Sequence, residues 1–353
     1  MAGISMKELA DILGVSTASV SVALRGMPGI SEETRQRILN EAQQRGYDMS
    51  RLSTAQARGT IAIIDYTYYL NDPQPRDTYS YYTQFADAAA ACINQNGYTA
   101  AGPFHPSPEW SLKDRPADGY ILLGAGITPE QLDAFIARKV PFVVAGNPLG
   151  HMPVTTVTHD NDYGIHSAMA HLRDQGHREI GYIASISGPA GKGRLCAYLR
   201  EIYADASMQS PENIFDIRSD AHFIDTEQIL ERIGGWLDMS APTATAFVCD
   251  NDFTAASLMR ALRSRGLTPG RDVAVTGFDD QPFCALLEPP LTSIHTFEPE
   301  LAAVCVEQLI HTMRHPEHQH RHIKIGTKLV LRESTKCRPD QGSHIHAEGQ
   351  AQP

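Results

Sequence analysis

The strongest constraint on the fold of this chain is an alternation of apolar runs and amphipathic helical patterns that starts at residue 60. Continuous apolar runs are typical of strands that are buried on both faces, as in parallel sheets covered by helices. The alternation therefore predicts an α/β fold, and the number of runs favours two parallel sheets over one. The expected strands are 60–64, 120–123, 141–145, 179–184, 244–249 and 272–278, and the expected helices are 83–95, 129–138, 163–175, 192–206, 253–265 and 301–313.

The residues before this region have a different pattern, which predicts two short helices joined by a tight turn at Gly14. Apolar residues recur at helical spacing on both, with Leu9 on the first and Val20 on the second. Ser16 is expected to cap the second helix, and a third helix is expected between Ser31 and Gly46. This layout is that of a helix-turn-helix head, which contacts base edges with the N-terminal part of its second helix. The alternative is a three-helix packing unit without a DNA role.

The charge of the chain is unevenly distributed. The whole chain of 353 residues has a net charge of −11, but residues 1–60 carry seven Lys and Arg against six Asp and Glu, a net +1, so that the remainder carries −12. An acidic remainder disfavours non-specific contact with DNA. Because the head is only weakly basic, we expect phosphate contacts to depend on geometry and on two copies of the head.

Cysteine use and hydropathy limit the class of protein. The six cysteines include no Cys-x-x-Cys pair, so that neither a disulfide framework nor a zinc site is expected, and free thiols fit a reducing cytosol. The sequence shows no signal peptide, and no apolar run approaches the ~20 residues of a membrane helix. We therefore expect a cytoplasmic protein.

An ordered series of short segments resembles the LacI-type (lactose repressor-like) family of bacterial transcription regulators. The resemblance covers residues 4 to about 335, and each segment alone is weak. The segments are 15–16, 20–21, 31–35, 38–39 and 46–47 in the head, and 117–121, 140–141, 160–164, 176–180, 251–252, 277–280, 290–294 and 331–334 beyond it.

The resemblance implies a division of the chain into a DNA-binding head at 1–47, a hinge at 48–59 and a periplasmic-binding-protein-like core at 60–335. Within the core we expect a first lobe at about 60–159 and 292–325 and a second lobe at about 160–291. The tail 336–353 is polar and is expected to be disordered. The family further implies a homodimeric repressor that binds a pseudo-palindromic operator and whose affinity for DNA is set by a small effector, most often a sugar.

The residues expected to contact DNA lie in the head and the hinge. Val22 replaces an arginine that is frequent in the family, and Gln56 replaces a leucine that wedges between base pairs, which puts kinking of the operator in doubt. The full set is Ser5, Ser16, Thr17, Ala18, Ser19, Ser21, Val22, Arg25, Arg51, Ser53, Thr54 and Gln56.

The residues expected to contact the effector suit a polyol. Arg194 and Asp279 match the family's arginine and acid that bind ligand hydroxyls, and Thr296 stands where a glutamine often touches ligand. The alternatives are a solvated helix charge for Arg194 and a helix cap for Asp279. The full set is Tyr81, Tyr82, Asn147, Arg194, Phe223, Asn251 and Asp279.

Other motifs give weaker evidence of a functional site. The segment 188–194 fails the spacing of a phosphate-binding P-loop, and the adjacent side chains of Asp279 and Asp280 are expected to diverge, so that they form no acid–base pair. Histidines 311, 315, 318, 320 and 322 could bind metal, but an exposed, solvated loop is the favoured interpretation. We expect no cofactor, no metal and no enzymatic activity.

Two other functions remain open from the sequence. One is a cytoplasmic sugar-binding receptor without a DNA role, and the other is a regulator controlled by a protein corepressor instead of a small molecule. A sugar-processing enzyme would need a catalytic constellation that the sequence does not offer.

Overall fold

The computed structural model describes thirteen stretches of the chain. They are residues 4–24, 29–47, 57–66, 81–106, 112–113, 115–124, 127, 129–149, 152–185, 188–204, 213–217, 226–240 and 242–336. By internal contacts the chain divides into two compact units, residues 1–61 with 90–101 and residues 62–89 with 102–353. Six expected site residues lie outside the described stretches, namely Arg25, Arg51, Ser53, Thr54, Gln56 and Phe223.

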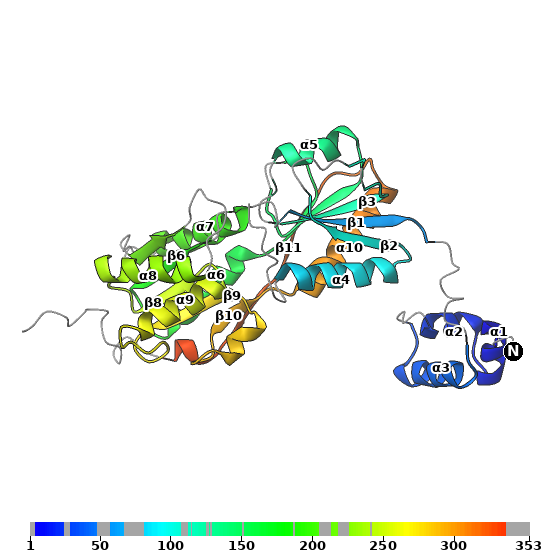
Figure 1. Cartoon of the computed structure of the whole chain (residues 1–353), viewed down its shortest axis with the longest axis horizontal. Coiled ribbons are helices and arrows are strands. Elements are labelled where there is room, and N and C mark those ends of the chain that lie inside the picture. Colours follow the sequence, from blue (N-terminus) through cyan, green and yellow to red (C-terminus); the bar gives the residue numbers. More distant parts are fainter. Residues whose placement is uncertain are drawn as a thin grey trace, which may run out of the picture. The chain divides into compact units, whose positions relative to one another are not determined.

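The head contains the three expected helices, α1 (Met6–Leu13), α2 (Thr17–Leu24) and α3 (Glu32–Gln44) (Figure 1). Gly14 ends α1 in the left-handed conformation at φ +64°, which is the backbone freedom that the tight turn requires. Ser16 and Ser31 accept hydrogen bonds from the backbone N–H groups three residues later, at 3.0 and 3.2 Å, and so cap α2 and α3. The helices enclose a core of Leu9, Ala10, Val20, Ala23, Leu24, Ile38, Ala42 and Tyr47.

The first sheet has six strands in the order β11-β5-β4-β3-β1-β2. Helices α4 (Tyr81–Gln95) and α10 (Glu298–Arg314) lie on one side of it and α5 (Pro129–Ala137) on the other (Figure 1). The strands are β1 (Thr60–Asp65), β2 (Thr99–Phe104), β3 (Gly119–Leu123), β4 (Phe142–Ala145), β5 (Thr156–His159) and β11 (His322–Ile325). Strands β3, β4, β5 and β11 run parallel, so that their carboxyl ends share one edge.

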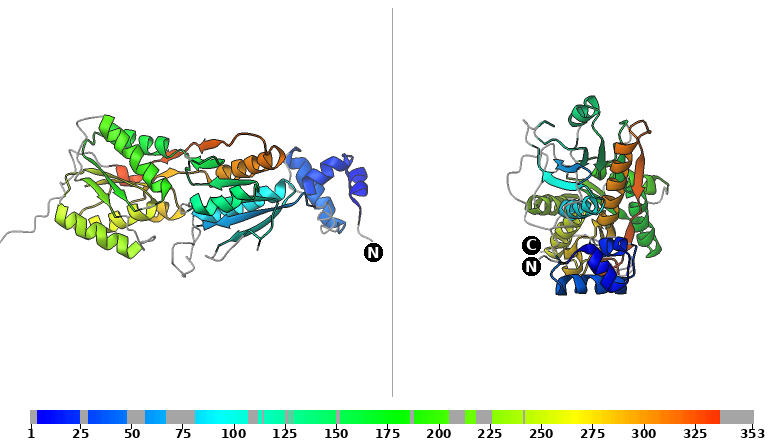
Figure 2. Two further views of the ribbon diagram at one scale, coloured as in Figure 1. Left: turned by 90° about the horizontal axis from the view of Figure 1, so that it is seen from above. Right: turned by 90° about the vertical axis from the view of Figure 1, so that its right-hand side faces the viewer.

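The second sheet has six strands in the order β12-β10-β9-β8-β6-β7, parallel except for β12. Its strands are β6 (Ile180–Ala184), β7 (Ile214–Asp216), β8 (Ala246–Cys249), β9 (Ala274–Asp279), β10 (Thr292–His295) and β12 (Lys328–Val330). Its helices are α6 (Asn161–Asp174), α7 (Pro189–Ala204), α8 (Thr226–Ser240) and α9 (Asp252–Arg263), and a second view shows them on both faces (Figure 2).

Strand β8 shows how the second sheet is buried on both faces. Phe247 and Cys249 belong to a hydrophobic cluster with α8 and α9, whereas Ala246 and Val248 belong to a cluster with α6 and α7. Gly181 pairs with Phe247, and a side chain there would come within 2.4 Å of the phenyl ring. The sequence pattern of continuous apolar strands is thus explained by helices covering both faces.

The chain passes between the two sheets three times, at 159–161, 295–298 and 325–328. The first and third passages are joined, because the Asp160 N–H donates to the Ile325 carbonyl at 2.8 Å and Lys324 forms an ion pair with Asp162 at 2.8 Å. The expected lobe boundary at 291 was wrong in one respect: β10 pairs with β9, not with the first sheet. Within the described residues, no helix has both the length and the apolar character needed to span a membrane.

The sequence missed the strands β2, β5, β7, β10, β11 and β12 and also the 15-residue helix α8. The histidine-rich segment was expected to be an exposed loop, but it ends in β11, where His322 pairs with Thr156 of β5. The alternation of exposed and half-buried residues in β11 marks it as an edge strand, which carries no continuous apolar run.

Candidate functional site

Arg194 and Asp279 meet at the carboxyl edge of the second sheet. Arg194 lies on α7 and is 5% exposed, and Asp279 is the last residue of β9. The Arg194 guanidinium donates from Nη2 to Asp279 Oδ1 at 3.1 Å, from Nη1 to the Asp250 carbonyl and from Nε to Asn161 Oδ1 at 3.1 Å. It also stacks on the Phe278 ring, 3.6 Å from the centroid. The arginine is therefore a buried, fixed cation and not a solvated helix charge.

Asp279 is held in an unusual environment. Burial raises its pKa to about 6, although the positive charge of Arg194 acts in the opposite direction, and the nearby Glu298 raises it further. Its backbone adopts φ +105°, which turns the chain sharply after β9. The next residue points elsewhere: Asp280 forms an ion pair with Arg332 at 2.7 Å. The two adjacent carboxylates thus diverge, as the sequence predicted, and do not form an acid–base pair.

Asn251 caps a helix at the same edge of the second sheet. Its Oδ1 accepts from the Thr254 N–H at 2.8 Å and caps α9, while its Nδ2 donates to Ser185 Oγ at 3.2 Å. Ser185 in turn donates to the carboxylate of the fully buried Asp250 at 3.0 Å. This network fixes the strand ends that surround Arg194, so that the guanidinium is held in one position.

The carboxyl edge of the first sheet carries neutral polar groups. The hydroxyl of Tyr81, at the start of α4, lies 2.7 Å from His159 Nε2, at the end of β5. Asn147, which follows β4, is fully buried and donates from Nδ2 to the Gly124 carbonyl at 3.3 Å. Among the described residues, Asn147 Oδ1 and His159 Nδ1 are buried without a hydrogen-bond partner. Buried polar atoms in this state are costly, and they are suited to receive a ligand's hydrogen bonds.

The two sets of side chains act on one another electrostatically. Burial and, to a smaller extent, the positive charge of Arg194 lower the pKa of His159 to about 3, so that the ring is neutral at physiological pH. Burial also raises the pKa of the Tyr81 hydroxyl, with smaller contributions from Tyr82 and from Asp279. The charged pair of the second sheet and the neutral groups of the first therefore belong to the same neighbourhood.

Two further residues, Thr296 and Tyr82, lie near the Arg194–Asp279 pair and Tyr81. Thr296 is fully buried and donates from Oγ1 to Glu298 Oε1 at 2.6 Å. The ring of Tyr82 packs edge-on against Tyr81, with the centroids 5.0 Å apart. Of the expected effector set, the structure therefore brings Tyr81, Asn147, Arg194, Asn251 and Asp279 to the carboxyl edges of the two sheets.

On the head, the expected DNA-contacting residues fall into two groups. Ser5 forms a capping box with Glu8, and Ser16 both accepts from the Ser19 N–H and lies 2.9 Å from the Ser19 hydroxyl. Thr17 and Ala18 are exposed at the first turn of α2, whereas Ser21 and Val22 are half-buried. The hydroxyls of Ser5, Ser16 and Ser19 therefore shape the helix ends, and the exposed surface at the start of α2 is formed by Thr17 and Ala18.

Known proteins match both parts of the chain. A periplasmic binding protein-like domain matches residues 169–335. The HTH-type transcriptional regulator reg1 of Streptomyces lividans is 27% identical over 352 residues, which cover 94% of this chain and 98% of the relative. The solved CelR–cellobiose complex has a TM-score of 0.69 at 22% identity and covers 94% of this chain and 99% of its own. The lac repressor dimer bound to operator and the anti-inducer ONPF has a TM-score of 0.66 at 20% identity, covering 95% and 99%.

The chain is thus similar over nearly its whole length to a protein named as an HTH-type transcriptional regulator, and it shares its fold with CelR and the lac repressor. These matches confirm the fold class that the sequence predicted. The relatives named here are regulators, and none of them is named as an enzyme. The roles of single residues in DNA and effector binding remain predictions.

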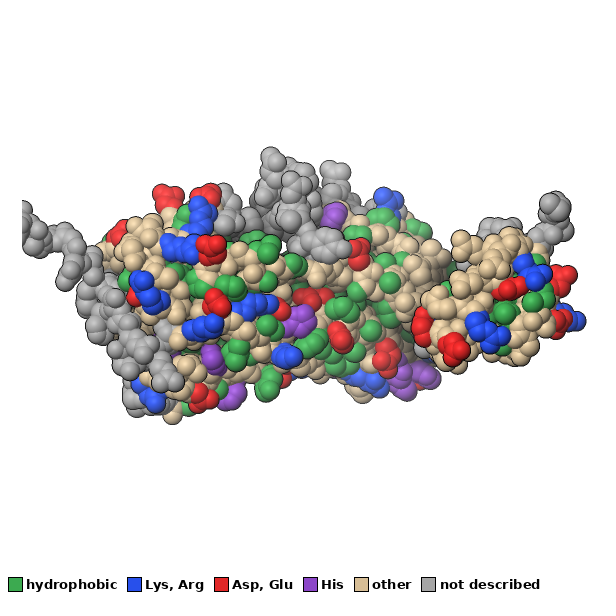
Figure 3. All heavy atoms as spheres, turned by 90° about the horizontal axis from the view of Figure 1, so that it is seen from below, with side chains coloured by type: hydrophobic (Ala, Val, Ile, Leu, Met, Phe, Trp, Pro, Cys, Tyr) green, Lys and Arg blue, Asp and Glu red, His purple; other side chains and the backbone are tan. Residues whose placement is uncertain are grey.

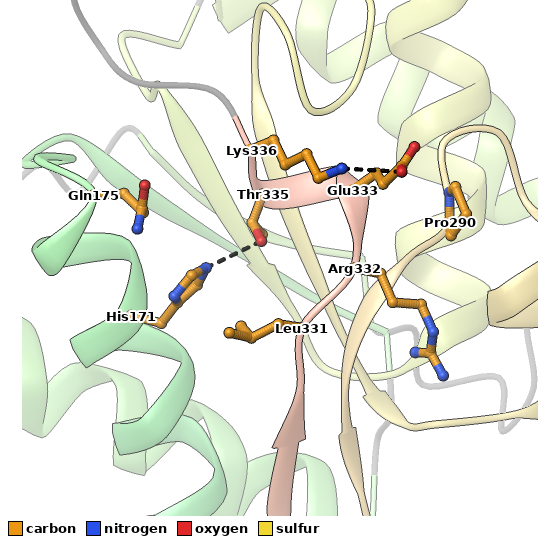
Figure 4. A pocket seen from close by; sticks show the side chains of 8 residues that line it. All are labelled: His171, Gln175, Pro290, Leu331, Arg332, Glu333, Thr335 and Lys336. Carbon is orange, nitrogen blue, oxygen red and sulfur yellow. Dashed lines mark hydrogen bonds and ion pairs between the residues drawn. The ribbon is translucent and has the colours of Figure 1, made fainter.

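A surface hollow of the second lobe is lined by none of the expected effector-contacting residues. It has a volume of about 590 Å³ and is lined by His171, Gln175, Pro290, Leu331, Arg332, Glu333, Thr335 and Lys336 (Figure 4). Ser334 donates to the Val275 carbonyl and accepts from the Thr292 N–H, which places this segment at the amino ends of β9 and β10. Ligands of open α/β sheets bind beyond the carboxyl ends, so that this hollow is a poor candidate for the effector.

Sequence reasoning missed His159 because it missed the strand that carries it. Strand β5 is Thr156-Val157-Thr158-His159, which has only one large aliphatic residue. The signal that could have found it is its position directly before Asp160, the N-cap of α6.

On the face shown in Figure 3, Lys and Arg side chains alternate with Asp and Glu instead of forming a continuous basic field, consistent with the acidic balance outside the head.

Proposed function

We propose that this protein is a LacI-type DNA-binding transcriptional regulator, a repressor, that acts as a homodimer in the cytoplasm. The head binds one half of a pseudo-palindromic operator, and the core binds a small effector that sets the affinity for DNA. The observation that carries the proposal is the buried Arg194–Asp279 pair, which faces neutral polar groups in a chain that starts with a helix-turn-helix head.

The chemistry of the core favours a polyol, most simply a mono- or oligosaccharide. Three of the five guanidinium N–H groups of Arg194 donate to protein oxygens, which leaves donors for a ligand hydroxyl. The second oxygen of Asp279 can accept a hydroxyl proton, and Asn147 Oδ1 and His159 Nδ1 offer neutral partners. The CelR structure, which contains cellobiose, shows that this fold can hold a sugar.

The head supports DNA binding through the first turn of α2. Thr17 and Ala18 are exposed there, and small side chains allow the helix to approach base edges closely. Arg25 and the hinge residues Arg51, Ser53, Thr54 and Gln56 lie outside the described residues and stay predictions. Because the lac repressor structure is a dimer on operator DNA, we propose the same twofold arrangement for this chain.

The proposed mechanism is a shift in populations. The effector binds one arrangement of the two lobes more tightly, and this arrangement positions the two heads better or worse for the half-sites. A difference of ~1–3 kcal/mol between the two states is sufficient to change the occupancy of DNA many-fold. The three chain passages between the sheets are the places where such a change has to occur.

The experiment is a fluorescence-anisotropy titration of the full chain on DNA from the region upstream of its own gene, with and without a panel of sugars. We expect nanomolar, specific binding that at least one sugar changes by five-fold or more. Residues 60–353 alone should bind the same sugar but no DNA. Sugar binding without specific DNA binding by the full chain would instead support the receptor without a DNA role.

A corepressor protein is the remaining alternative, and the same titration separates it. If DNA binding is specific and no small molecule changes it or shifts the melting temperature, the effector half of the proposal fails. The proposal that the head binds operator DNA would then remain supported without a small-molecule effector.

A further inference from the structure

Five histidines fall between residues 311 and 322, and three of them gather with a glutamate where α10 ends. Helix α10 ends at Arg314, and the His315 N–H donates to the His311 carbonyl at 2.9 Å. In the turn that follows, the His318 N–H donates to the His315 carbonyl at 3.1 Å. The turn therefore brings His318 back beside His315, with Glu317 between them.

The atoms of this cluster have the spacing of metal ligands. Glu317 Oε1 lies 3.6 Å from His315 Nδ1 and 3.5 Å from His318 Nε2. The three ligand atoms all lie within 4.8 Å of one another. A tetrahedral Zn²⁺ with bonds of about 2.0–2.1 Å separates its ligands by about 3.4 Å. Only a small closure of exposed side chains is needed to reach that geometry.

His311 holds one of the ligands in the right orientation. Its Nε2 lies 2.9 Å from His318 Nδ1. A metal on His318 Nε2 requires the proton to sit on Nδ1, and His311 Nε2 is placed to accept that proton in a hydrogen bond. Metal-binding histidines usually have such a partner, because it fixes both the tautomer and the ring orientation.

Charged groups of both signs surround the cluster, and Glu317 is its one acidic ligand. Arg321 lies beside His311, with its Nη2 3.4 Å from Nε2, the same nitrogen that faces His318, so that its positive charge opposes a cation in the cluster. Glu307 also acts on His311 and opposes that charge. The side chains of His315, Glu317 and His318 are 47%, 66% and 46% exposed, which leaves the ion open to solvent.

We propose that His315, Glu317 and His318 bind one divalent transition-metal ion, with His311 as the positioning residue for His318. Two imidazoles and one carboxylate suit Zn²⁺, and Ni²⁺ or Cu²⁺ by the same chemistry. Water completes the coordination. The ion connects the end of α10 to the segment that enters β11, the strand that leads to the third passage between the sheets. The proposal does not depend on DNA or sugar binding.

The test uses the full chain without a polyhistidine tag, freed of metal by EDTA. Titration with Zn²⁺ against a chromophoric chelator should give one ion per chain with a Kd in the micromolar range. The double variant His315→Ala/His318→Ala should weaken binding at least ten-fold. The matched control is His166→Ala, because His166 and Glu201 form an exposed pair at 2.8 Å on the second lobe but belong to no three-ligand group among the described residues.

Co²⁺ provides a second readout that does not depend on affinity. A four-coordinate site should give strong visible absorption, which the double variant should lose and His166→Ala should keep. His311→Ala should weaken Zn²⁺ binding less than the double variant does, because it removes only the orienting partner. Unchanged Zn²⁺ affinity in the double variant, or no binding below millimolar Zn²⁺, would overturn the proposal.

Discussion

The two sheets have six strands each, but their carboxyl edges differ in chemistry. The edge of the second sheet holds a charged pair that protein partners fix in place, with Arg194 donating to three protein oxygens. The edge of the first sheet holds neutral groups, and two of their buried atoms have no partner among the described residues. We infer that the second edge offers a ligand a rigid charged pair, whereas the first edge offers neutral buried atoms that have no partner among the described residues.

The largest expected effect is that of Arg194→Ala, which tests whether the second edge is essential to the fold. The substitution leaves the buried Asp279 carboxylate without its cation, and breaking a buried pair in this way costs about 3–5 kcal/mol. Urea unfolding followed by circular dichroism should show this loss. The control is Arg200→Ala on the same helix, because Arg200 is exposed and pairs with Asp162 at the surface. Its effect should stay below about 1 kcal/mol.

The second prediction separates anchoring from folding at Asp279. Asp279→Asn keeps an acceptor for Arg194 but removes the charge, so that sugar affinity at pH 7.5 should fall about 10–100-fold, the worth of one charged hydrogen bond. Because the pKa of Asp279 is about 6, the affinity of the unaltered chain should decline as the pH falls through 6, and the Asn variant should lose this dependence. Calorimetric titration between pH 5 and pH 8 measures both. Equal pH profiles of the two proteins would contradict the assignment.

The raised pKa of the same carboxyl predicts that the free energy of unfolding depends on pH. Its pKa is raised from 3.8 to about 6, so that between these values the folded chain binds the proton more tightly than the unfolded chain does. The contribution of Asp279 to the free energy of unfolding therefore decreases as the pH rises from about 4 to about 6. Subtracting the Asp279→Asn profile from that of the parent isolates this contribution from that of Asp252, whose pKa is raised to about 8.

A pair of asparagines tests the contrast between the edges directly. Asn251 caps α9 at the second edge, so that Asn251→Ala should cost about 1 kcal/mol of stability. Asn147→Ala removes one hydrogen bond, from Nδ2 to the Gly124 carbonyl at 3.3 Å, but it also removes a buried Oδ1 without a partner among the described residues. The two effects oppose one another, so that stability should change by less than about 0.5 kcal/mol. The order should reverse for sugar affinity, with Asn147→Ala the more damaging. Equal losses of stability in the two variants would remove the distinction between the edges.

What the sequence predicted depended on the length and apolar character of each element. The three helices of the head, the Gly14 turn and the caps at Ser16 and Ser31 follow from local patterns, and the structure confirms them. Arg194 and Asp279 came from the family resemblance, and they do lie side by side.

Short or polar strands could not be predicted in the same way. Strand β5 pairs with β4 on one side and with β11 on the other, and β11 pairs with a strand that lies more than a hundred positions earlier in the sequence. His159 was therefore missed, and His322 was expected in a loop although it begins a strand. The lack of a partner at Asn147 Oδ1 is likewise a property of three-dimensional packing that no local pattern encodes.

The smallest expected effect concerns Tyr81, whose hydroxyl lies 2.7 Å from His159 Nε2. Because the His159 ring is neutral at physiological pH, this is a hydrogen bond between neutral groups, and Tyr81→Phe should cost about 0.5–1.5 kcal/mol of stability. The loss should be independent of pH between 5 and 8, since neither group titrates in that range. Unfolding of the variant at pH 5, 6.5 and 8 measures this. A loss that grows toward acid pH would mean that His159 becomes charged, and the first edge would then not be neutral.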